Sequence, residues 1–403
     1  MDLPTTADDS PVNPPTTVTL PLRFHGSGAE YFRIWIVNLL LTLVTLGFYY
    51  PWAKVRRLKY FYNHTLLAEH GFEFHGVPRA MLRGMAMVGV LFFLYSFASE
   101  FSPVAGLIAA LAVTGLWPFL WRTAIRFRLA NTSWRGLRFA FVGNVRGAII
   151  AAGIPTALLL VPLAVAAFWM LGDVPEESQE MEAEMRRQGM ITLGIFLPWL
   201  LALPWFLWFA ERYRRGAFRY AQIATEFSAG AGAIYLLALR LVGVLLGGVL
   251  LLTPVAVLAA VFAGSDATET EDVFAALKSA RFVFGMTLFG LAYLVMILLV
   301  RAYAVARLQN LLWSHTHAPS LTIHSRLRFR STLGLMLKNW LLVLLSFGLY
   351  WPFAAVALWR LRIEAISLDL AVPLETLVGS GTGGESESAG EMAADLADFD
   401  FGW

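Results

Sequence analysis

The chain has 403 residues, of which 58% are hydrophobic, 14% aromatic and only 15% charged, with a net charge of +3 and a mean hydropathy of +0.63. Soluble chains carry about 25% charged residues, so this composition cannot cover a water-facing surface and indicates an integral membrane protein. It excludes a cytosolic enzyme, a secreted disulfide scaffold and a disordered regulator. The absence of cysteine also excludes thiol chemistry, iron–sulfur clusters and thiolate zinc sites.

In chain order, we expect a disordered acidic, Pro- and Thr-rich arm over residues 1–22, a membrane domain over 23–378 and a disordered acidic tail over 379–403. The arm has no apolar core and does not resemble a signal peptide. Within the membrane domain, apolar runs approach the ~20 residues that a bilayer-spanning helix needs. There are six of them, at 81–99, 104–121, 148–171, 190–209, 233–263 and 282–300. We therefore predict three transmembrane hairpins.

Acidic and basic residues lie at opposite ends of these apolar runs. Six carboxylates lie in the loop 173–184 and four in the loop 266–272, whereas residues 120–146 contain six arginines and no carboxylate. Under the positive-inside rule, the basic segments face the cytoplasm and the acidic loops face outward. The same rule predicts that both termini are cytoplasmic.

The chain contains an internal repeat, which is a sign of one recurring structural unit. Residues 38–53, NLLLTLVTLGFYYPWA, align without gaps with NWLLVLLSFGLYWPFA at 339–354. Three prolines each precede, by 23 residues, a phenylalanine that opens a short motif ending in glycine, and a basic residue follows each of them by eight residues. These prolines are Pro51, Pro118 and Pro204, and Pro352 occupies the same place in the last copy. We predict five pseudo-repeats, at about 23–76, 74–143, 141–230, 227–325 and 323–378.

Each repeat is predicted to contain a span ending near its proline, a basic aromatic helix at the membrane surface, and a short period-two strand such as FEFHG or LRFAFVG. Two of these strands turn on Gly76 and Gly143. The predicted fold class is an all-α polytopic membrane protein with short cytoplasmic β-strands that pair with one another. Its two related end segments, 31–50 and 332–351, either re-enter the membrane as broken hairpins or cross it once.

The stretch FHGSGAEYFRIWIVNLLLTLVTLGFYYPWAKVRRLKYFYNHT, followed by FEFHG, resembles the YjgN family of bacterial inner-membrane proteins. The resemblance covers about residues 20–370, and LGxYxPWAKVRRxxYFxxxT is its most specific part. It implies a multi-pass protein of the bacterial inner membrane and brings no established activity or site residues. The last repeat departs from the motif, with Ala355, Ala357 and Leu358 where the first repeat has Lys54, Arg56 and Arg57.

The basic aromatic helix is the main candidate site. Cations near a surface of anionic headgroups contribute ~1 kcal/mol each, so these residues suit a lipid headgroup or an anionic solute. The alternative is an ordinary positive-inside flank with an aromatic belt. The candidates are Lys54, Arg56, Arg57, Lys59, Tyr60, Arg126 and Arg212.

Two further cations, Arg240 and Lys338, lie inside apolar runs, where a charge costs ~3 kcal/mol. They either line a polar pathway through the membrane or extend to its surface by snorkelling. Glu211 and Glu226 are nearby acids, and either could pair with such a cation.

Histidines are weak metal-binding candidates, because three or four of them would have to converge to hold a transition metal. The residues concerned are His64, His75, His315, His317 and His324. The alternative is hydrogen bonding around the glycine turns. G-x-S-x-G, H-E-x-x-H and P-loop motifs are absent from the sequence. We therefore predict no enzymatic activity, no cofactor and no metal.

Pseudo-repeats, prolines in helices and intramembrane cations are features of transporters. They favour transport, or a channel, for a small anionic solute. The alternative is a non-transporting scaffold or anionic-lipid-binding membrane protein. The expected partners are anionic membrane lipids, an anionic solute and a second copy of the chain, with no nucleic acid.

Overall fold

The computed structural model describes residues 18–161, 178–267 and 280–371. In these ranges the chain repeats one order of elements, which we call a unit: an outgoing strand, a hairpin of helices and a return strand. The tail 379–403 lies outside the described residues, as do residues 1–17 of the predicted arm and much of both acidic loops. Residues 18–22, predicted as part of that arm, instead belong to the first strand.

The first unit contains β1 (Val18–Phe24), α1 (Gly28–Val44), α2 (Tyr50–Asn63) and β2 (Thr65–Leu67), and the second contains β3 (His70–Phe74), α3 (Pro78–Phe101), α4 (Pro103–Ala130) and β4 (Thr132–Trp134). The third contains β5 (Leu137–Phe141), α5 (Val145–Ala148), the π-helical turn η1 (Ile149–Gly153), α7 (Ser178–Arg215) and β6 (Phe218–Tyr220). The fourth contains β7 (Ile223–Ala224), β8 (Glu226–Phe227), α8 (Ala231–Ala267), α10 (Ala280–Ser314) and β9 (Thr316–Ala318). The fifth contains β10 (Leu321–Ser325), α11 (Phe329–Leu345), α12 (Trp351–Ile363) and β11 (Ile366–Leu370).

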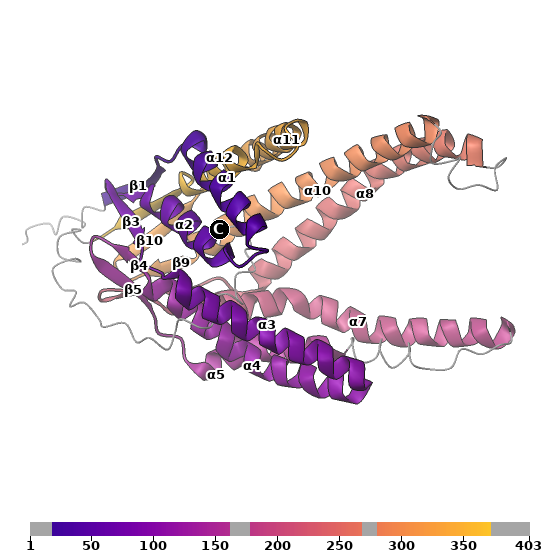
Figure 1. The fold of residues 1–403 in the computed structure, drawn as a ribbon, viewed down its shortest axis with the longest axis horizontal. Coiled ribbons are helices and arrows are strands. Elements are labelled where there is room, and N and C mark those ends of the chain that lie inside the picture. The colour runs from indigo at the N-terminus through magenta and orange to yellow at the C-terminus, as the bar shows by residue number, and fades with distance from the viewer. Residues whose placement is uncertain (1–17, 162–177, 268–279, 372–403) are drawn as a thin grey trace, which may run out of the picture.

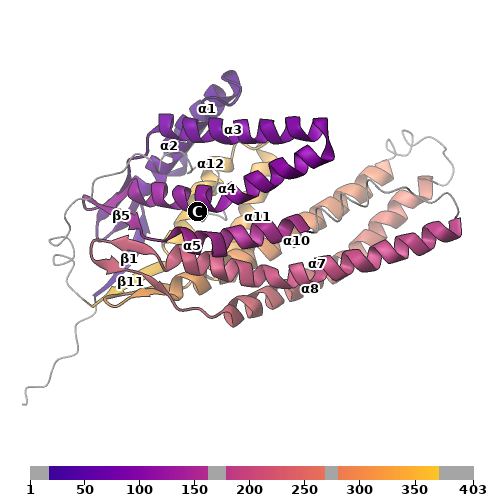
Figure 2. The ribbon, with the colours of Figure 1, turned by 90° about the horizontal axis from the view of Figure 1, so that it is seen from below.

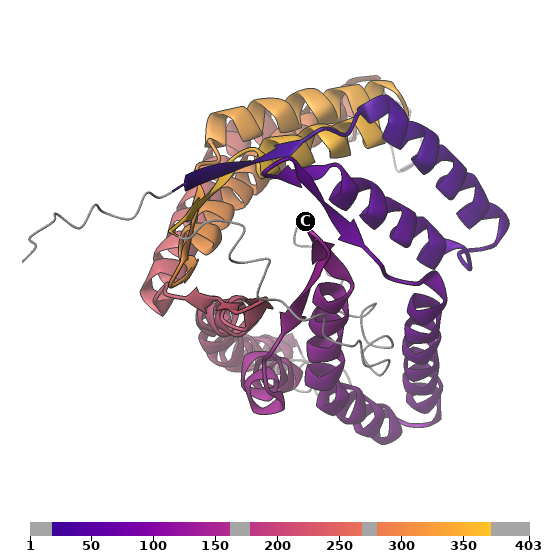
Figure 3. The same ribbon diagram turned by 90° about the vertical axis from the view of Figure 1, so that its left-hand side faces the viewer.

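The strands of all units form one antiparallel sheet of eleven strands, in the order β7-β6-β5-β4-β3-β2-β1-β11-β10-β9-β8. Its two end strands, β7 and β8, are neighbours in sequence and are separated only by Thr225. The backbone N–H of Thr225 donates to the carbonyl of Phe218, so this segment pairs with β6 through its first half and with β9 through its second. The sheet therefore forms a nearly closed ring, from which the helices rise (Figure 3).

The prediction of an all-α fold with short strands was wrong, because the sheet is continuous and nearly closed. The outgoing strands carry a recognisable period-two pattern. The return strands in the first four units have only three residues each and follow directly on a helix, so they have no readable period. The pairing of β1 with β11 joins the two ends of the described chain, and no local pattern can indicate such a contact.

Each helical hairpin is clamped at its base by pairing between the two strands of its own unit. One backbone hydrogen bond recurs just beyond the outgoing strand, at 2.8–3.0 Å in all five units. The donors are the N–H groups of His25, His75, Val142, Ser228 and Arg326, and the acceptors are the carbonyls of His64, Asn131, Ala217, His315 and Ala365. Both ends of every hairpin are thus held at the same level of the ring.

Side chains then link each unit to the next. In four places a side-chain N–H from a descending helix donates to the carbonyl two residues beyond an outgoing strand of the following unit, at 2.7–2.9 Å. The donors are Arg122, Trp208, Asn310 and Arg360, which bind the carbonyls of Gly143, Ala229, Leu327 and Gly26, respectively. The geometry recurs although the residue type does not, and the last of these bonds joins unit five to unit one.

Within the described residues, five helices are long and apolar enough to cross a membrane: Pro78–Phe101, Val104–Ala130, Arg186–Arg215, Ala231–Val261 and Phe282–Ser314. Large apolar side chains are exposed along them, as expected for surfaces that face lipid. The sixth predicted span, 148–171, runs beyond the described residues, and its described part is a shorter apolar helix, Val145–Val161. The long helices extend from the sheet in one common direction (Figures 1 and 2).

The end segments 31–50 and 332–351 contain the first helix and the turn of two hairpins, whose second helices, α2 and α12, return to the sheet. α1 and α11 each have 17 residues, or ~26 Å at 1.5 Å per residue. The chain reverses after them at Leu46-Gly47 and at Phe347-Gly348, where all four residues have φ between 50° and 94°. The alternative of a single straight crossing does not describe these segments.

Closure of the ring can be tested with cysteines, because the chain has none of its own. Leu20 of β1 lies opposite Leu368 of β11, and Ile323 lies one strand further along. We expect a Leu20→Cys/Leu368→Cys variant to form an intramolecular disulfide under mild oxidation, seen as a mobility shift on a non-reducing gel.

The matched control is Leu20→Cys/Ile323→Cys. Its cysteines are two strand spacings apart, ~9.6 Å, which exceeds the ~7 Å limit for a disulfide. Equal cross-linking of both pairs, or of neither, would contradict the closed sheet.

Candidate functional site

Two adjoining cavities lie between the first and last helical hairpins, near the sheet. Their volumes are about 370 Å³ and 280 Å³, and they share a wall formed by Arg57, Phe61, Trp351, Ala355 and Trp359. We call them together the double cavity. It lies between α2 and α12, and these helices belong to adjacent units because β1 pairs with β11.

The lining of the double cavity is cationic. Its charged residues, among those that the structure describes, are Lys54, Arg57, Arg128, Arg301 and Arg362. These cations come from α2, α4, α10 and α12, which belong to four different units. Like charges gathered from separate elements repel one another, and Lys54, Arg57, Arg128 and Arg362 each make a further interaction in the structure.

Arg362 is the most buried of these cations, with 8% of its surface exposed. Its Nε donates to Oε1 of Gln309 at 2.8 Å, and Nε2 of Gln309 donates back to the carbonyl of Arg362 at 2.9 Å. This reciprocal pair fixes the guanidinium in place with neutral groups.

Two asparagines at the same position of the repeat line the two cavities, Asn38 the first and Asn339 the second. Nδ2 of Asn38 donates to the carbonyl of Ala53 at 3.4 Å, and Nδ2 of Asn339 donates to that of Ala354 at 3.3 Å. Each amide thereby links the two helices of its own hairpin. Within the described residues, their Oδ1 atoms are buried without a hydrogen-bond partner. The remaining lining is largely aromatic and apolar.

The candidate helix α2 divides its predicted residues between two faces. Lys54, which is half-buried, and Arg57, which is exposed, line the double cavity, whereas the exposed Arg56 and Lys59 do not. The Arg56 guanidinium lies over the Tyr49 ring at 5.7 Å. The Tyr60 hydroxyl donates to the carbonyl of Ser27 at 2.8 Å, and burial together with the nearby Glu30 carboxylate raises the pKa of Tyr60 to about 12. Tyr60 is therefore a neutral structural donor at physiological pH.

The basic position that recurs eight residues after each proline lies elsewhere. Its members, Lys59, Arg126, Arg212 and Arg360, are all exposed, and none of them lines the double cavity. The Arg212 guanidinium stacks over Trp208 at 5.1 Å, and Arg360 carries the inter-unit hydrogen bond described above. Arg240 on α8 and Lys338 on α11 are also exposed and are not among the cavity-lining residues.

Sequence reasoning missed Arg128, Arg301 and Arg362. Arg128 and Arg362 each follow a repeat proline by ten residues, a spacing that could have indicated them. Arg301 has no such signal, because the fourth copy lacks the proline. It enters the site because α10 packs against α11, which belongs to the next unit along the chain.

Residues 19–396 match the family described as "Bacterial protein of unknown function (DUF898)". The chain belongs to this family. It is 28% identical over 196 residues to inner membrane protein YjgN of Escherichia coli K12, covering 46% of this chain and 48% of that protein. It is 30% identical over 128 residues to inner membrane protein YjgN of Salmonella typhimurium, covering 32% of each chain. The aligned parts thus span a third to a half of these relatives, and the predicted resemblance to the YjgN family is confirmed. No solved structure matches the chain.

The histidines of this DUF898 chain are distributed around the ring. His64 contacts the Tyr60 carbonyl, His75 the Ser133 hydroxyl, His315 the Leu311 carbonyl and His324 the Asp369 carboxylate, all at 2.7–3.0 Å, and His317 lies on β9. Among the described residues, no group of three or more potential metal ligands occurs. These contacts instead connect strands and helix ends.

The repeat prolines and glycines have different surroundings in different units. Pro51 and Pro352 lie at the first turns of α2 and α12, whereas Pro118 and Pro204 lie inside the continuous helices α4 and α7. The predicted break between span and basic helix is therefore absent in units two and three. At Gly76 and Gly143, an added Cβ would lie 2.5–2.6 Å from the ring of Phe74 or Phe141, so the ring occupies the space of a side chain.

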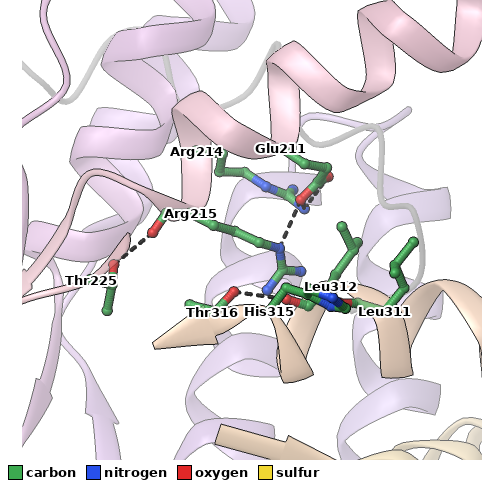
Figure 4. Close-up of polar contacts among 8 residues, drawn as sticks. All are labelled: Glu211, Arg214, Arg215, Thr225, Leu311, Leu312, His315 and Thr316. Carbon is green, nitrogen blue, oxygen red and sulfur yellow. Dashed lines mark hydrogen bonds and ion pairs between the residues drawn. The ribbon is translucent and has the colours of Figure 1, made fainter. Parts of the chain in front are cut away.

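A buried charge cluster joins units three and four where the sheet closes. Glu211 accepts from Arg214 at 2.7 Å and from Arg215 at 2.8 Å, so it pairs within α7 and not with Arg240 or Lys338. Arg215 is 2% exposed, points from α7 toward the end of α10 (Figure 4), and lies over the Trp313 ring at 4.7 Å. Its carbonyl accepts the hydroxyl of Thr225, the residue at which the closing segment changes partners.

We expect this cluster to contribute much of the stability at the place where the sheet closes between units three and four. Removing one partner of a buried ion pair costs ~3–5 kcal/mol, because the remaining charge loses its counter-charge. We expect Glu211→Gln to lower the melting temperature of the purified protein by at least about 5 °C, measured by intrinsic fluorescence. Glu226→Gln, which removes an exposed carboxylate on β8, serves as the control and should change it by less than about 1 °C. Similar melting temperatures for the two variants would contradict this role.

Proposed function

We propose that this protein resides in the bacterial inner membrane, binds an anion in the double cavity and transports it. The observation that carries the proposal is the convergence of five cations from four helices around the double cavity, namely Lys54, Arg57, Arg128, Arg301 and Arg362. The location is supported by the names of the relatives and by the five apolar helices.

The distribution of charge supports an orientation in which the sheet faces the cytoplasm. The basic segments of α2, α4 and α7 adjoin the sheet, and cytoplasmic ends of spans are enriched in lysine and arginine. In this orientation the double cavity lies at the cytoplasmic level of the membrane. The hairpins α1–α2 and α11–α12 enter the membrane from the cytoplasmic side and return to that side. An anion from the cytoplasm would meet the cations first.

The cation types support an oxyanion such as phosphate as the bound group. Four of the five cations are arginines, whose planar guanidinium donates two parallel hydrogen bonds to phosphate or carboxylate oxygens. Lys54 adds a mobile point charge. An anion held by several groups from different helices also couples its own binding to the relative positions of those helices, as transport requires.

A second candidate function is the binding of an anionic lipid without transport. The observation that favours it is the aromatic layer beside the cations, formed by Tyr49, Tyr50 and Trp52 in the first hairpin and by Tyr350 and Trp351 in the last. Aromatic belts of this kind mark the level of lipid headgroups. Uptake measurements separate the two functions, because only the first predicts movement of the anion into vesicles.

The anion site can be tested with two double variants of one helix that change the charge equally. Lys54→Gln/Arg57→Gln removes two cations from the cavity, and Arg56→Gln/Lys59→Gln removes two exposed cations from the other face of α2. Using radiolabelled inorganic phosphate and purified protein, we expect the cavity variant to weaken binding at least tenfold and the control by less than twofold. Uptake of the same label into proteoliposomes should fall in parallel.

Two results would contradict the proposal. In one, the unaltered protein neither binds phosphate nor takes it up. In the other, both variants weaken binding equally, which would indicate attraction to the basic surface in general.

A further inference from the structure

Resting on the proposed membrane location and not on the bound anion, we propose that the turns of the first and last hairpins end inside the hydrocarbon of the bilayer and contact acyl chains there. These tip turns, as we call them, are residues 45–50, which join α1 to α2, and residues 346–351, which join α11 to α12. The two turns occupy the same position of the repeat. Their side chains, their backbone hydrogen bonds and the height of the first one above the sheet support the inference.

The side chains of the tip turns are large, apolar and exposed. Leu46 and Phe48 are 91% and 73% exposed in the first turn, and Phe347 is 98% exposed in the last. Leu46 and Phe347 also have a φ of 50°, in the left-handed region that glycine and asparagine adopt most readily. A turn in water would favour those two residue types. Contact with acyl chains accounts for leucine and phenylalanine at these positions.

Every backbone N–H of the first tip turn has a partner inside the hairpin. The N–H groups of residues 45–48 and 50 donate to backbone carbonyls at 2.8–3.1 Å. The N–H of Tyr49 donates to the hydroxyl of Thr45 at 3.0 Å, and that hydroxyl donates to the carbonyl of Leu41 at 2.7 Å. The next residue, Pro51, has no N–H. Each backbone donor of this turn is thus satisfied without water.

The last tip turn repeats this pattern with a serine. The N–H groups of residues 346–349 and 351 donate to backbone carbonyls at 2.8–3.2 Å, and the N–H of Tyr350 donates to the hydroxyl of Ser346 at 2.9 Å. Pro352 follows, as Pro51 does in the first turn. An unpaired N–H finds no partner in hydrocarbon, whereas water would supply one. Complete pairing of the N–H groups in both turns is what insertion into lipid requires.

The length of the first hairpin places its tip turn near the middle of the bilayer. Arg33 on α1 and Arg83 on α3 are exposed, and each lies eight residues beyond the N–H that clamps its hairpin, on His25 or His75. Cations at this level mark the phosphate layer. Beyond Arg83, α3 continues for 18 residues, or ~27 Å, which is close to the ~30 Å thickness of the hydrocarbon. Beyond Arg33, α1 continues for only 11 residues, or ~17 Å.

The absence of cysteine allows the tip turns to be located with single-cysteine variants in right-side-out and inverted membrane vesicles. Leu46→Cys and Phe347→Cys report on the tips. Thr19→Cys, exposed on β1, reports on the sheet side of the membrane, and Glu100→Cys, exposed at the far end of α3, reports on the other side. Labelling with a membrane-impermeant maleimide is measured for each variant. Labelling after unfolding in SDS confirms that every cysteine is reactive once it is accessible.

We expect Thr19→Cys to be labelled from the sheet side only and Glu100→Cys from the opposite side only. The two tip cysteines should react at least tenfold more slowly than these references from either side, because hydrocarbon excludes the reagent. A bimane fluorophore attached to a tip cysteine should be quenched more by phosphatidylcholine brominated near the end of the acyl chain than by the lipid brominated near the headgroup.

Two labelling results would overturn the inference. Rapid labelling of the tips from the side of Thr19 would place them in water beside the sheet, and rapid labelling from the side of Glu100 would show that the hairpins cross the membrane. Stronger quenching near the headgroup would overturn the depth. Labelling of Thr19→Cys and Glu100→Cys from one and the same side would overturn the proposed arrangement in the membrane, and it would leave the anion site to its own binding test.

The role of the hydroxyl is tested by Ser346→Ala, with Ser99→Ala as the control. Both hydroxyls donate to a carbonyl of the preceding helical turn, at 3.2 Å and 2.8 Å, and of the two only that of Ser346 accepts a backbone N–H. In lipid, alanine leaves the N–H of Tyr350 without a partner. We therefore expect Ser346→Ala to lower the melting temperature in nanodiscs by at least about 3 °C more than Ser99→Ala does. Equal melting temperatures would show that water replaces the hydroxyl, which contradicts insertion.

Discussion

The architecture depends on backbone pairing at the base of each helical hairpin. Outside the bilayer a two-stranded ribbon of three-residue strands has little stability of its own. Here each ribbon shares its edges with the next, and the segment 223–227 pairs at both ends of the series. A closed series leaves few unpaired edges, so every hairpin is fixed at its base. The helices above can then expose apolar surface to lipid without needing extensive contacts with one another.

Closure also decides where the site can be. Units one and five are the most distant in sequence, and the pairing of β1 with β11 makes them neighbours. Their hairpins are the shortest, so the ring has a region where helices stop early and a cavity remains between α2 and α12. Arg128 and Arg301 enter this region from the adjoining long helices. The cationic cavity is thus a consequence of two short hairpins meeting within a ring of longer ones.

The elements that could be predicted from the sequence were those with a local signal. Long apolar runs indicated the spanning helices, and period two indicated outgoing strands such as β3 and β5. The return strands, the partner switch at Thr225 and the β1–β11 pair depend on contacts between distant residues, and the all-α fold class was wrong for that reason. Of the residues that line the double cavity, Lys54 and Arg57 were predicted from their density of charge, and Arg301 was not, because it directly follows the apolar run 282–300, where a flanking cation is ordinary.

The contrast between repeated and unrepeated cations bears on function. Lys59, Arg126, Arg212 and Arg360 recur at one spacing and are exposed, and Arg360 and Arg212 already have partners in Gly26 and Trp208. A cation that recurs in the units is explained by a role common to them. That role is contact with the membrane surface or linkage to the neighbouring unit. Lys54 and Arg57 have Ala355 and Leu358 as their counterparts in the last unit, and both line the cavity. Lys54 and Arg57, which break the repeat, thus meet Arg128 and Arg362, which share one repeat position, at a single cavity.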